Sequence, residues 1–310
     1  MIYNNILEAI GNTPLVKLNR LVDDSCADIL VKFEATNIGG SIKTRTALNM
    51  IEAAEAEGLI DKDSIIVEPT SGNQGIGLAL VGAVKGYRTI IIMPDSVSEE
   101  RRKLVHHYGA EVKLIHDYGD IGQCIDECVK CALKMKEKNP KVYVPQQFEN
   151  INNVMAHKKH TVVEIFNALE GRTVDGFCSG IGTGGTLTGI GEELKAKFPS
   201  VLIWAVEPEN AAILAGGTIG THLQMGIGDG IIPAIFNQSI YDEVCIISDR
   251  EAIETSKRLA KEEGLMCGIS SGTNVAAALK LAKKLGPGKT VLTVLPDTAE
   301  RYFSTPLFGE

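Results

Sequence analysis

Residues Asn37-Ile38-Gly39-Gly40-Ser41-Ile42-Lys43 form the stretch around which the rest of the chain is organised. An apolar run at residues 29–33 predicts a strand before it, and residues 44–57 predict a helix after it. In that helix the apolar residues recur every three or four positions. A loop of small residues therefore delivers one lysine, Lys43, to the start of a helix. A strand, a loop and a helix in this order are the repeating unit of an α/β fold.

Three other stretches have the same character, because each is rich in Gly, Ser and Thr and opens a predicted helix. They are Glu68-Pro69-Thr70-Ser71-Gly72-Asn73-Gln74-Gly75, Ser179-Gly180-Ile181-Gly182-Thr183-Gly184-Gly185-Thr186 and Gly268-Ile269-Ser270-Ser271-Gly272. Such turns leave backbone N–H groups free at the start of a helix, where an anion can bind. Several anion-binding turns together with one lysine indicate a phosphorylated cofactor and a substrate that carries a carboxylate. The combination points to pyridoxal 5'-phosphate (PLP) and an amino acid.

Predicted strands and helices alternate along the chain. The expected strands are 65–67, 89–93, 112–115, 142–144, 174–178, 201–206, 244–247 and 291–295. The expected helices are 76–84, 98–107, 121–138, 154–169, 187–198, 251–263 and 274–285. This alternation predicts mainly parallel sheets covered by helices on both faces, with ligands at the carboxyl ends of the strands. A glycine-rich region at 216–230 is expected to be a functional loop, and residues 150–154 are a candidate domain boundary.

Composition and charge narrow the class of protein. The 310 residues are enough for about two domains, and 44% hydrophobic with 23% charged residues is ordinary for a soluble globular protein. A net charge of −8 disfavours nucleic acid and anionic membranes as partners. The N-terminus does not have the pattern of a signal peptide, and no apolar run is long enough to span a membrane. Seven cysteines without regular spacing fit a reduced compartment, so a cytoplasmic protein is expected.

No metal site is expected. Cys124, Cys128 and Cys131 have helical spacing, but small buried side chains explain them better than zinc ligands, which normally come in two pairs from separate turns. The six histidines form no constellation that predicts catalysis or metal binding.

The motif Gly180-x-Gly182-x-x-Gly185 leaves a second class of protein open. It matches the dinucleotide fingerprint formally, and Glu207 lies near the spacing of a ribose ligand, so an NAD-dependent dehydrogenase is an alternative. The pattern is weak and lies in the second half of the chain. The run Gly182–Thr186 also offers two hydroxyls and several N–H groups, which suits a single terminal phosphate better than a pyrophosphate.

A carboxylate site and an activated lysine are the other functional predictions. Thr70, Ser71 and the N–H groups of the helix that follows suit a substrate carboxylate, although simple helix capping explains the same residues. Gln147, which follows a predicted strand, can add an amide donor, although a surface loop is its simpler interpretation. The helix start and apolar neighbours are expected to depress the pKa of Lys43, which favours Schiff-base chemistry.

Taken together, these stretches resemble the O-acetylserine sulfhydrylase (cysteine synthase) family of tryptophan-synthase-β-like PLP enzymes. The resemblance runs from Ile10-Gly11-Asn12-Thr13-Pro14-Leu15 to Glu300-Arg301-Tyr302 and covers nearly the whole chain. It implies two α/β domains with twisted, mainly parallel sheets and an active site in the cleft between them. The smaller domain is expected at 46–149 and the larger, PLP-anchoring domain at 1–45 plus 150–310.

The resemblance also implies roles for individual residues. Lys43 matches the lysine that holds the cofactor covalently and then acts as general base. Asn73 matches the partner of the cofactor's 3'-oxygen, and Ser270 matches the partner of its pyridine nitrogen. The phosphate loop corresponds to Gly182, Thr183, Gly184, Gly185 and Thr186. The carboxylate-binding set corresponds to Thr70, Ser71 and Gln147, and Gln74 is expected to join it.

The chain departs from the family pattern at several positions. Gln74 stands where the family usually has threonine, and residues 160–165 replace a segment richer in Pro, Thr and Gly. Asp229 is charged where alanine is common, in a loop expected near the β-carbon of the substrate. Asp229 is therefore a candidate to activate water or a second amino acid as the nucleophile, and a solvated loop aspartate is the alternative.

The resemblance predicts β-replacement on a β-substituted alanine, with cysteine synthase as the leading activity: O-acetylserine and sulfide give cysteine and acetate. The alternative is a cysteine-consuming enzyme that releases hydrogen sulfide and forms serine or lanthionine. The expected partners are a second copy of the chain, in a homodimer, and the C-terminal peptide of serine acetyltransferase.

Overall fold

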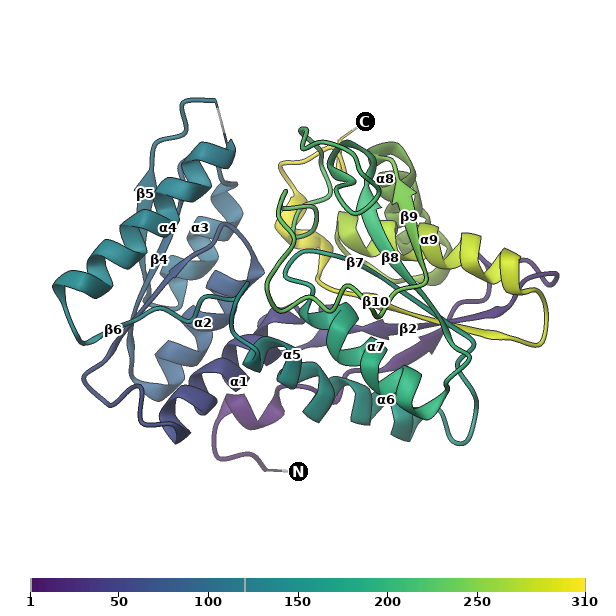
Figure 1. Ribbon diagram of the computed structural model, residues 1–310, viewed down its shortest axis with the longest axis horizontal. Coiled ribbons are helices and arrows are strands. Elements are labelled where there is room, and N and C mark those ends of the chain that lie inside the picture. The colour runs from purple at the N-terminus through teal and green to yellow at the C-terminus, as the bar shows by residue number, and fades with distance from the viewer. Residues whose placement is uncertain (1, 120, 310) are drawn as a thin grey trace. The chain divides into compact units, whose positions relative to one another are not determined.

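Strands and helices alternate as the sequence predicts in the computed structural model, which describes residues 2–119 and 121–309 (Figure 1). The chain divides into two compact units. The first unit consists of Met1–Gly11 and Lys43–Asn153, and the second of Asn12–Ile42 and Val154–Glu310. The predicted division assigned residues 1–45 to the larger domain. In the structure residues 1–11 group with the first unit instead, because the short helix η1 (Ile6–Ala9) contacts a helix of that unit, α2.

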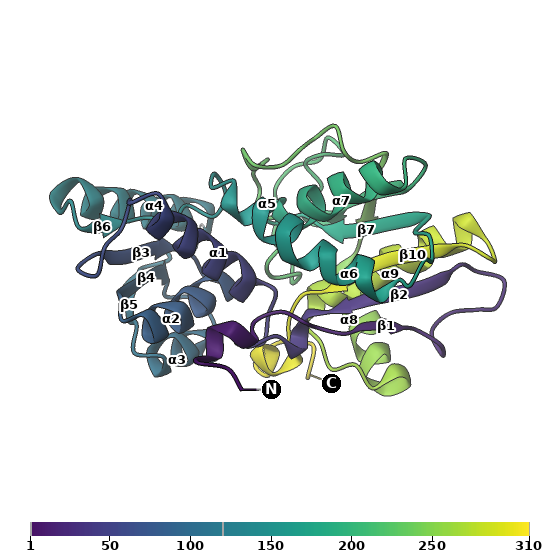
Figure 2. The same cartoon turned by 90° about the horizontal axis from the view of Figure 1, so that it is seen from below.

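The first unit is built on a four-stranded parallel sheet with the order β5-β4-β3-β6. Its strands are β3 (Ile65–Pro69), β4 (Arg88–Pro94), β5 (Glu111–Ile115) and β6 (Val142–Tyr143). Its helices are α1 (Lys43–Ala56), α2 (Asn73–Lys85), α3 (Glu99–His107) and α4 (Ile121–Lys138). Figure 2 shows α4 on one side of this sheet and α2 and α3 on the other. Both faces are covered, so the predicted parallel-sheet architecture is confirmed for this unit.

The second unit contains a six-stranded sheet with the order β1-β2-β10-β7-β8-β9, in which only β1 is antiparallel to its neighbour. Its strands are β1 (Leu15–Lys17), β2 (Asp28–Phe33), β7 (Gly176–Gly180), β8 (Leu202–Pro208), β9 (Glu243–Ile247) and β10 (Thr290–Leu295). Its main helices are α6 (Val162–Ala168), α7 (Gly185–Lys197), α8 (Asp249–Arg258) and α9 (Ile269–Leu285). Helices α6 and α7 lie on one side of the sheet, and α8 and α9 on the other (Figure 2).

Two hydrophobic cores hold this second sheet between its helices. One core joins the strands to α8 and α9 through side chains such as Val206, Ala252 and Leu281. The other joins them to α6 and α7 through Phe177, Ile190 and Ile203. The alternating side chains of each strand supply both cores, which explains why these strands read as continuous apolar runs.

Helix starts are where the structure differs most from the sequence-based expectation. Helix α9 begins at Ile269 rather than at 274, α2 at Asn73 rather than at 76, and α7 at Gly185 rather than at 187. The apolar periodicity that predicts a helix begins only after its first turn, and Gly, Ser and Thr fill that turn here. The glycine-rich stretches are therefore the first helical turns themselves as well as the loops before them.

Two further expectations need correction. The single helix predicted over 154–169 is a run of α5 (Asn152–Ala156), the π-helical turn η3 (His157–Thr161) and α6. The helix predicted over 251–263 likewise ends in a π-helical turn, η5 (Leu259–Glu263). Each π-helical turn widens the helix locally, and η3 places the fully buried His157 beside α7.

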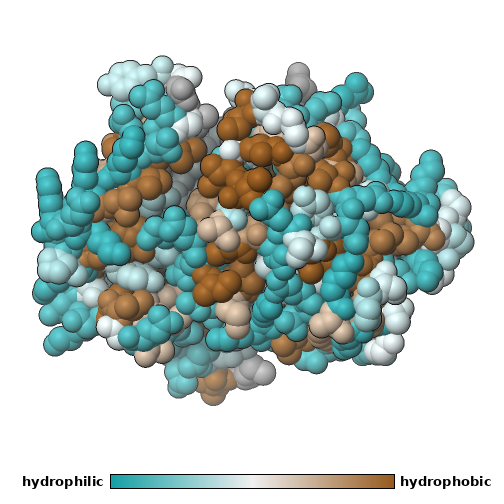
Figure 3. Space-filling model, in the orientation of Figure 1, coloured by the Kyte–Doolittle hydropathy of each residue, from teal (hydrophilic) through white to brown (hydrophobic). Residues whose placement is uncertain are grey.

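The surface is mainly hydrophilic, with separate hydrophobic patches on the face that Figure 3 shows. Among the described residues, Ile219, Ile231 and Ile232 of the irregular segment after β8 remain largely exposed. No helix within the described parts of the chain is long and apolar enough to cross a membrane. Cys124 and Cys128 are buried on α4, as the core interpretation predicts, and no group of His, Cys, Asp and Glu within residues 2–119 and 121–309 could hold a metal ion.

Candidate active site

The predicted site residues fall into two groups, one in each unit. The first unit carries Lys43, Thr70, Ser71, Asn73, Gln74 and Gln147, and the second carries Gly182–Thr186, Asp229 and Ser270. Helices α2, α7 and α9 begin at these groups, and their N-caps are Gly72, Gly184 and Gly268. None of these three N-caps receives a side-chain hydrogen bond from its helix. A glycine N-cap has no side-chain acceptor, which leaves first-turn N–H groups available to an anion. In α7 the N–H of Gly185 also lies 3.4 Å from the Thr183 hydroxyl oxygen.

Lys43 lies at the first residue of α1, and α2 packs closely against its backbone. A Cβ atom on Gly77 of α2 would lie 2.9 Å from the Lys43 carbonyl oxygen, so only glycine allows this approach. The Thr46 hydroxyl lies 2.9 Å from the same carbonyl and 2.7 Å from Oε1 of Gln74. The starts of α1 and α2 are thus joined, and Lys43 and Gln74 belong to one cluster.

Gln74 is buried, and its other amide atom has no hydrogen-bond partner among the described residues. The Thr46 hydroxyl has a single proton, which can go to Gln74 or to the Lys43 carbonyl. In either case one polar atom of the Gln74 amide stays unsatisfied in the protein interior, where this is unfavourable by about 1–3 kcal/mol. A polar group left unpaired here fits a site that a ligand completes.

Thr70 and Gln147 come together at the carboxyl ends of two neighbouring strands. Thr70 follows β3 and Gln147 follows β6, which pairs with β3 in parallel. Nε2 of Gln147 lies 3.2 Å from the Thr70 hydroxyl oxygen. Ser71 and Asn73 are half-buried in the turn between Thr70 and α2. Hydroxyl, amide and backbone N–H donors therefore gather at this edge of the sheet.

Glu68 lies immediately before this turn and is only 1% exposed. Its two carboxylate oxygens accept the backbone N–H groups of Gln146, at 2.9 Å, and Gln147, at 3.0 Å. Burial raises the pKa of Glu68 to about 7, although these two hydrogen bonds oppose the shift. Glu68 is a buried acid of this site with no role predicted from the sequence.

The turn Gly182–Thr186 of the second unit can be formed only by glycine at two positions. A Cβ atom on Gly182 would lie 2.3 Å from the carbonyl oxygen of Gly226. Gly184 has a φ of +76°, and a Cβ there would lie 2.6 Å from the Phe236 side chain. The turn is therefore a narrow cradle of backbone N–H groups with the hydroxyls of Thr183 and Thr186 beside it. These are the groups that bind a phosphate.

Asn274 and His157 form hydrogen bonds with residues of this cradle and of the strand before it. Oδ1 of Asn274 accepts the N–H of Gly180 at 2.7 Å, and its Nδ2 donates to the carbonyl of Val294 at 2.7 Å. Asn274 therefore fixes the end of β7 to the end of β10. Nε2 of the buried His157 lies 3.3 Å from the hydroxyl of Thr186. His157 is a buried, hydrogen-bonded histidine, and it also contacts the predicted phosphate loop.

Ser270 is buried in the first turn of α9, next to Ser271. The hydroxyl of Ser271 has no hydrogen-bond partner within the described residues. Gly272, one residue on, allows close packing with α8, because a Cβ there would meet the Ala252 carbonyl oxygen at 1.9 Å. The helix start that carries Ser270 is therefore rigidly placed.

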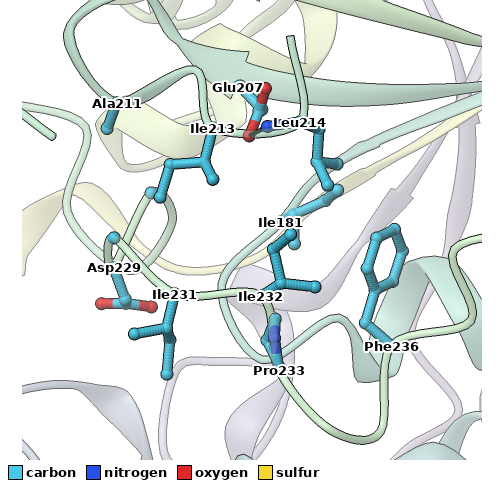
Figure 4. Close-up of a pocket in the computed structure, with 12 residues that line it drawn as sticks. Ile181, Glu207, Ala211, Ile213, Leu214, Asp229, Ile231, Ile232, Pro233 and Phe236 are labelled. Atoms are coloured by element: carbon cyan, nitrogen blue, oxygen red, sulfur yellow. Dashed lines mark hydrogen bonds between the residues drawn. The ribbon is translucent and has the colours of Figure 1, made fainter. Parts of the chain in front are cut away.

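Asp229 is exposed and lines a small pocket of the second unit (Figure 4). The pocket is lined by the irregular segment after β8 together with Ile181 and Phe236. The N–H of Gly228 donates to the Ile181 carbonyl at 2.8 Å, which ties the Asp229 loop to the predicted phosphate turn. In Figure 4 the carboxylates of Asp229 and Glu207 lie at separate ends of the pocket.

Glu207, which the dinucleotide interpretation treats as a ribose ligand, stabilises a loop of the protein instead. Its carboxylate accepts the backbone N–H groups of Leu214, at 2.9 Å, and Ala215, at 3.2 Å. Burial raises the pKa of Glu207, and these hydrogen bonds partly offset the effect. The side chain thus holds the segment after β8, and its oxygens are already engaged.

The loop before Lys43 is fixed by the C-terminal part of the second unit. Gly39 and Gly40 have φ values of +78° and +70°, which favour glycine strongly. A guanidinium nitrogen of Arg301 donates to the Gly39 carbonyl, and the N–H of Ile42 donates to the Pro296 carbonyl at 2.8 Å. This explains why two distant stretches of the sequence, 39–42 and 296–301, carry the same family resemblance.

The fold and these turns define an α/β enzyme with a site for a phosphorylated cofactor, a lysine and a carboxylate-bearing substrate. Residues 6–297 match the family described as pyridoxal-phosphate dependent enzymes. The chain belongs to this family, and the dehydrogenase alternative is set aside.

Known proteins similar to the chain share most of its length. A cysteine synthase of Staphylococcus aureus is 48% identical over 306 residues, which cover 99% of this chain and 97% of that protein. The solved structure of a hydrogen sulfide-producing enzyme from Fusobacterium nucleatum is 41% identical, with a TM-score of 0.90, and covers 97% of this chain and 100% of that chain. A cysteine synthase from Entamoeba histolytica is 38% identical, with a TM-score of 0.94, over 100% of this chain and 92% of that chain. The predicted tryptophan-synthase-β-like fold is confirmed.

The residues present fit PLP. The phosphate suits the turn at 182–186, where Gly182 and Gly184 leave no space for a Cβ and the backbone is closely packed. Lys43 is the family's expected attachment point, and buried donors such as the Gln74 amide and the Ser271 hydroxyl lack partners within the described chain. The roles of individual residues stay predictions, as does a depressed pKa of Lys43.

Proposed function

We propose that the chain catalyses PLP-dependent β-replacement and that its leading activity is the synthesis of L-cysteine from O-acetylserine and sulfide. The observation that carries this proposal is a cluster of polar residues in the first unit. Gln147 contacts Thr70 at the carboxyl end of the sheet. Nearby, Thr46 joins Gln74, at the start of α2, to Lys43, at the start of α1. The cysteine synthase of S. aureus, 48% identical, supports the choice of reaction.

In this proposal the first unit binds and orients the amino acid. The Thr70 and Ser71 hydroxyls, the Gln147 amide and the N–H groups of α2 bind the substrate carboxylate, and Gln74 joins them through its unsatisfied amide atom. When bound, PLP supplies the electron sink that makes the α-proton of an amino acid acidic. The Lys43 amine takes this proton as general base. The Cβ–O bond to acetate then breaks, a Cβ–S bond to sulfide forms, and the proton returns from the Lys43 amine to Cα.

In the second unit Gly182–Thr186 hold the phosphate, and Ser270 accompanies the pyridine nitrogen as a neutral partner. A serine hydroxyl need not keep that nitrogen protonated, which favours prompt elimination over long-lived carbanions. Asn73 of the first unit is assigned to the 3'-oxygen of the cofactor. Each assignment rests on the family resemblance and on the position of the residue at a helix start.

A substrate comparison tests the proposed function. Purified enzyme with PLP is mixed with O-acetylserine, O-phosphoserine, serine or cysteine, each with and without sulfide, and cysteine, sulfide and the released group are quantified. We expect O-acetylserine with sulfide to give the highest kcat/KM for cysteine formation, together with an equal amount of acetate. Cysteine formation from none of the β-substituted substrates would contradict the proposal.

A second candidate function is the release of sulfide from cysteine, and the specific observation in its favour is Asp229. Its carboxylate lies on the loop tied to the phosphate turn, with one oxygen 3.3 Å from where a Cβ on Gly182 would be. The hydrogen sulfide-producing enzyme from F. nucleatum, 41% identical, is consistent with this activity. Here Asp229 accepts the proton of the attacking water or amino acid, and sulfide leaves as serine or lanthionine forms.

Asp229→Asn separates the two activities. Asparagine keeps the shape but cannot accept the proton, so we expect the ratio of sulfide release from cysteine to cysteine synthesis to fall about 100-fold, the usual size of a general-base effect. Both rates are measured with the same enzyme preparation. Glu209→Gln, which neutralises an exposed acid near the same pocket, is the control and should leave the ratio unchanged. An unaltered ratio in Asp229→Asn would assign this aspartate to the solvated surface.

The proposal extends to partners and location. We assign a homodimer and a binding site for the C-terminal peptide of serine acetyltransferase on the family resemblance. Light scattering after size exclusion and a pull-down with that peptide test the two assignments. The free cysteines of the described chain support a reducing, cytoplasmic location.

A further inference from the structure

Glu68 is a buried acid for which the reaction itself has no use. It lies at the fourth position of β3, and the rest of that strand is Ile65, Ile66, Val67 and Pro69. A carboxylate that is 1% exposed needs strong hydrogen bonds to stay ionised. It finds them in the backbone N–H groups of Gln146 and Gln147, at 2.9 and 3.0 Å, which are 78 and 79 residues further along the chain. Glu68 therefore binds a loop, and that loop carries Gln147.

The backbone of this loop needs such a support. Gln146 has a φ of +54°, in the left-handed region that is unfavourable for residues other than glycine. The ladder between β3 and β6 includes only two residue pairs, and the chain leaves the sheet after Tyr143. The Gln146 carbonyl accepts the backbone N–H groups of Glu149 and Asn150 within the turn, and Asn153 donates to the Gln147 carbonyl at 2.8 Å. None of these contacts comes from the sheet. The carboxylate of Glu68 accepts the two N–H groups of this turn, those of Gln146 and Gln147.

The position of Gln147 decides what its side chain can do. Its Nε2 lies 3.2 Å from the Thr70 hydroxyl, and Thr70 is two residues after Glu68. The backbone of Glu68 lies in β3, directly before Pro69 and Thr70, and its carboxylate fixes the backbone of Gln147. The distance between the two predicted carboxylate ligands therefore depends on Glu68.

We infer that Glu68 is a positioning residue of the substrate-carboxylate site: its ionised side chain holds the Gln146–Gln147 backbone so that the Gln147 amide and the Thr70 hydroxyl face the substrate together. The inference deepens the proposed function and rests on it for the identity of the substrate. The contacts between Glu68 and the loop do not depend on that identity.

Both oxygens of Glu68 act as acceptors, and this explains the need for a carboxylate. Glutamine offers one acceptor, and its NH₂ group would meet a second N–H donor. Aspartate keeps the charge but is one methylene shorter. Because burial raises the pKa of Glu68 to about 7, experiments at pH 8 keep the wild-type side chain mainly ionised. Burial, and to a smaller extent the charge of Glu68, raises the pKa of the neighbouring Tyr143, so this phenol stays neutral at pH 8.

The first test measures the loop directly, without substrate. Hydrogen–deuterium exchange at pH 8 follows the peptide that contains residues 146 and 147 in the PLP-loaded protein. In Glu68→Gln we expect exchange of this peptide to rise at least about tenfold, because one N–H loses its charged acceptor. Glu68→Asp should give an intermediate rise. Glu149→Gln is the matched control, because the Glu149 carboxylate accepts from the side chain of Gln146, at 2.9 Å, rather than from its backbone, and it should leave the exchange unchanged.

The second test links the loop to substrate binding. At pH 8 we expect Glu68→Gln to raise KM for O-acetylserine about tenfold or more, since a misplaced amide weakens a charge-assisted hydrogen bond. The kcat at saturation should change less than about threefold, because Lys43 is untouched. Glu68→Asp should recover part of the affinity. Unchanged exchange in Glu68→Gln would overturn the inference whatever the substrate is.

The two tests fail in different ways. If the loop exchanges faster but KM stays at the wild-type value, the positioning role is wrong and the proposed reaction is unaffected. If no variant and no wild-type preparation turns over O-acetylserine, the proposed function is wrong, and the exchange experiment still decides whether Glu68 holds the loop.

Discussion

Lys43→Ala should lower cysteine formation by a factor of about 1,000 or more, because the variant loses both the covalent attachment of PLP and the general base. Lys43 is the first residue of α1, and Gly77 of α2 packs against its backbone carbonyl, which alanine keeps. The truncation therefore removes the amine with little disturbance of the helix. The yellow colour expected of a lysine-bound PLP should also be absent, although the phosphate turn of the second unit is intact.

The matched control is Lys62→Ala, which removes an exposed lysine of the same unit. It should keep the rate within about twofold and keep the colour, as surface substitutions usually do. Circular dichroism of both variants checks that the fold is intact. A Lys43→Ala protein that retains more than a tenth of the wild-type rate would show that another amine does the chemistry.

Gly182→Ala should have the second-largest effect and should act on the cofactor. The added Cβ would lie 2.3 Å from the Gly226 carbonyl oxygen and 3.3 Å from an Asp229 carboxylate oxygen. Since the nearer atom belongs to the backbone, the turn must shift and the N–H groups of the phosphate cradle move with it. We expect the dissociation constant of PLP to rise about 100-fold, which corresponds to about 3 kcal/mol.

Absorbance titration of the cofactor-free protein with PLP measures this effect, with thermal unfolding of the same samples to detect general destabilisation. Gly309→Ala is the control, because a Cβ at that position makes only ordinary contacts, at 3.5 Å or more. A PLP affinity of Gly182→Ala within threefold of wild type would mean that the phosphate is bound elsewhere.

The sequence predicts the turns of this site well because their chemistry is local. Gly39 and Gly40 before Lys43, and Gly184 before α7, have positive φ values, which is a local reason for glycine. Gly182 is the exception, because the atom that excludes a Cβ there is the distant carbonyl oxygen of Gly226. The alternation of apolar and polar segments likewise identifies the strands and the two-sided coverage of both sheets. These signals do not require knowledge of which strands pair.

The supporting residues could not be predicted because their partners are distant in the sequence. Glu68 contacts residues 78 and 79 positions away, Asn274 contacts Gly180 at a separation of 94, and Thr46 reaches Gln74 at 28. One signal was available for Glu68: an acidic residue directly after the apolar run 65–67 indicates a charge carried into the interior. Asn274 was assigned to a helix start only because the apolar pattern of α9 begins there, although the helix begins at Ile269.

Reduction of the PLP-loaded protein with borohydride, followed by peptide mapping, tests the central claim most directly. We expect one pyridoxyl-modified lysine, Lys43, where the loop 37–42 joins α1. Modification of any other lysine, or a protein that takes up no PLP before reduction, would contradict it.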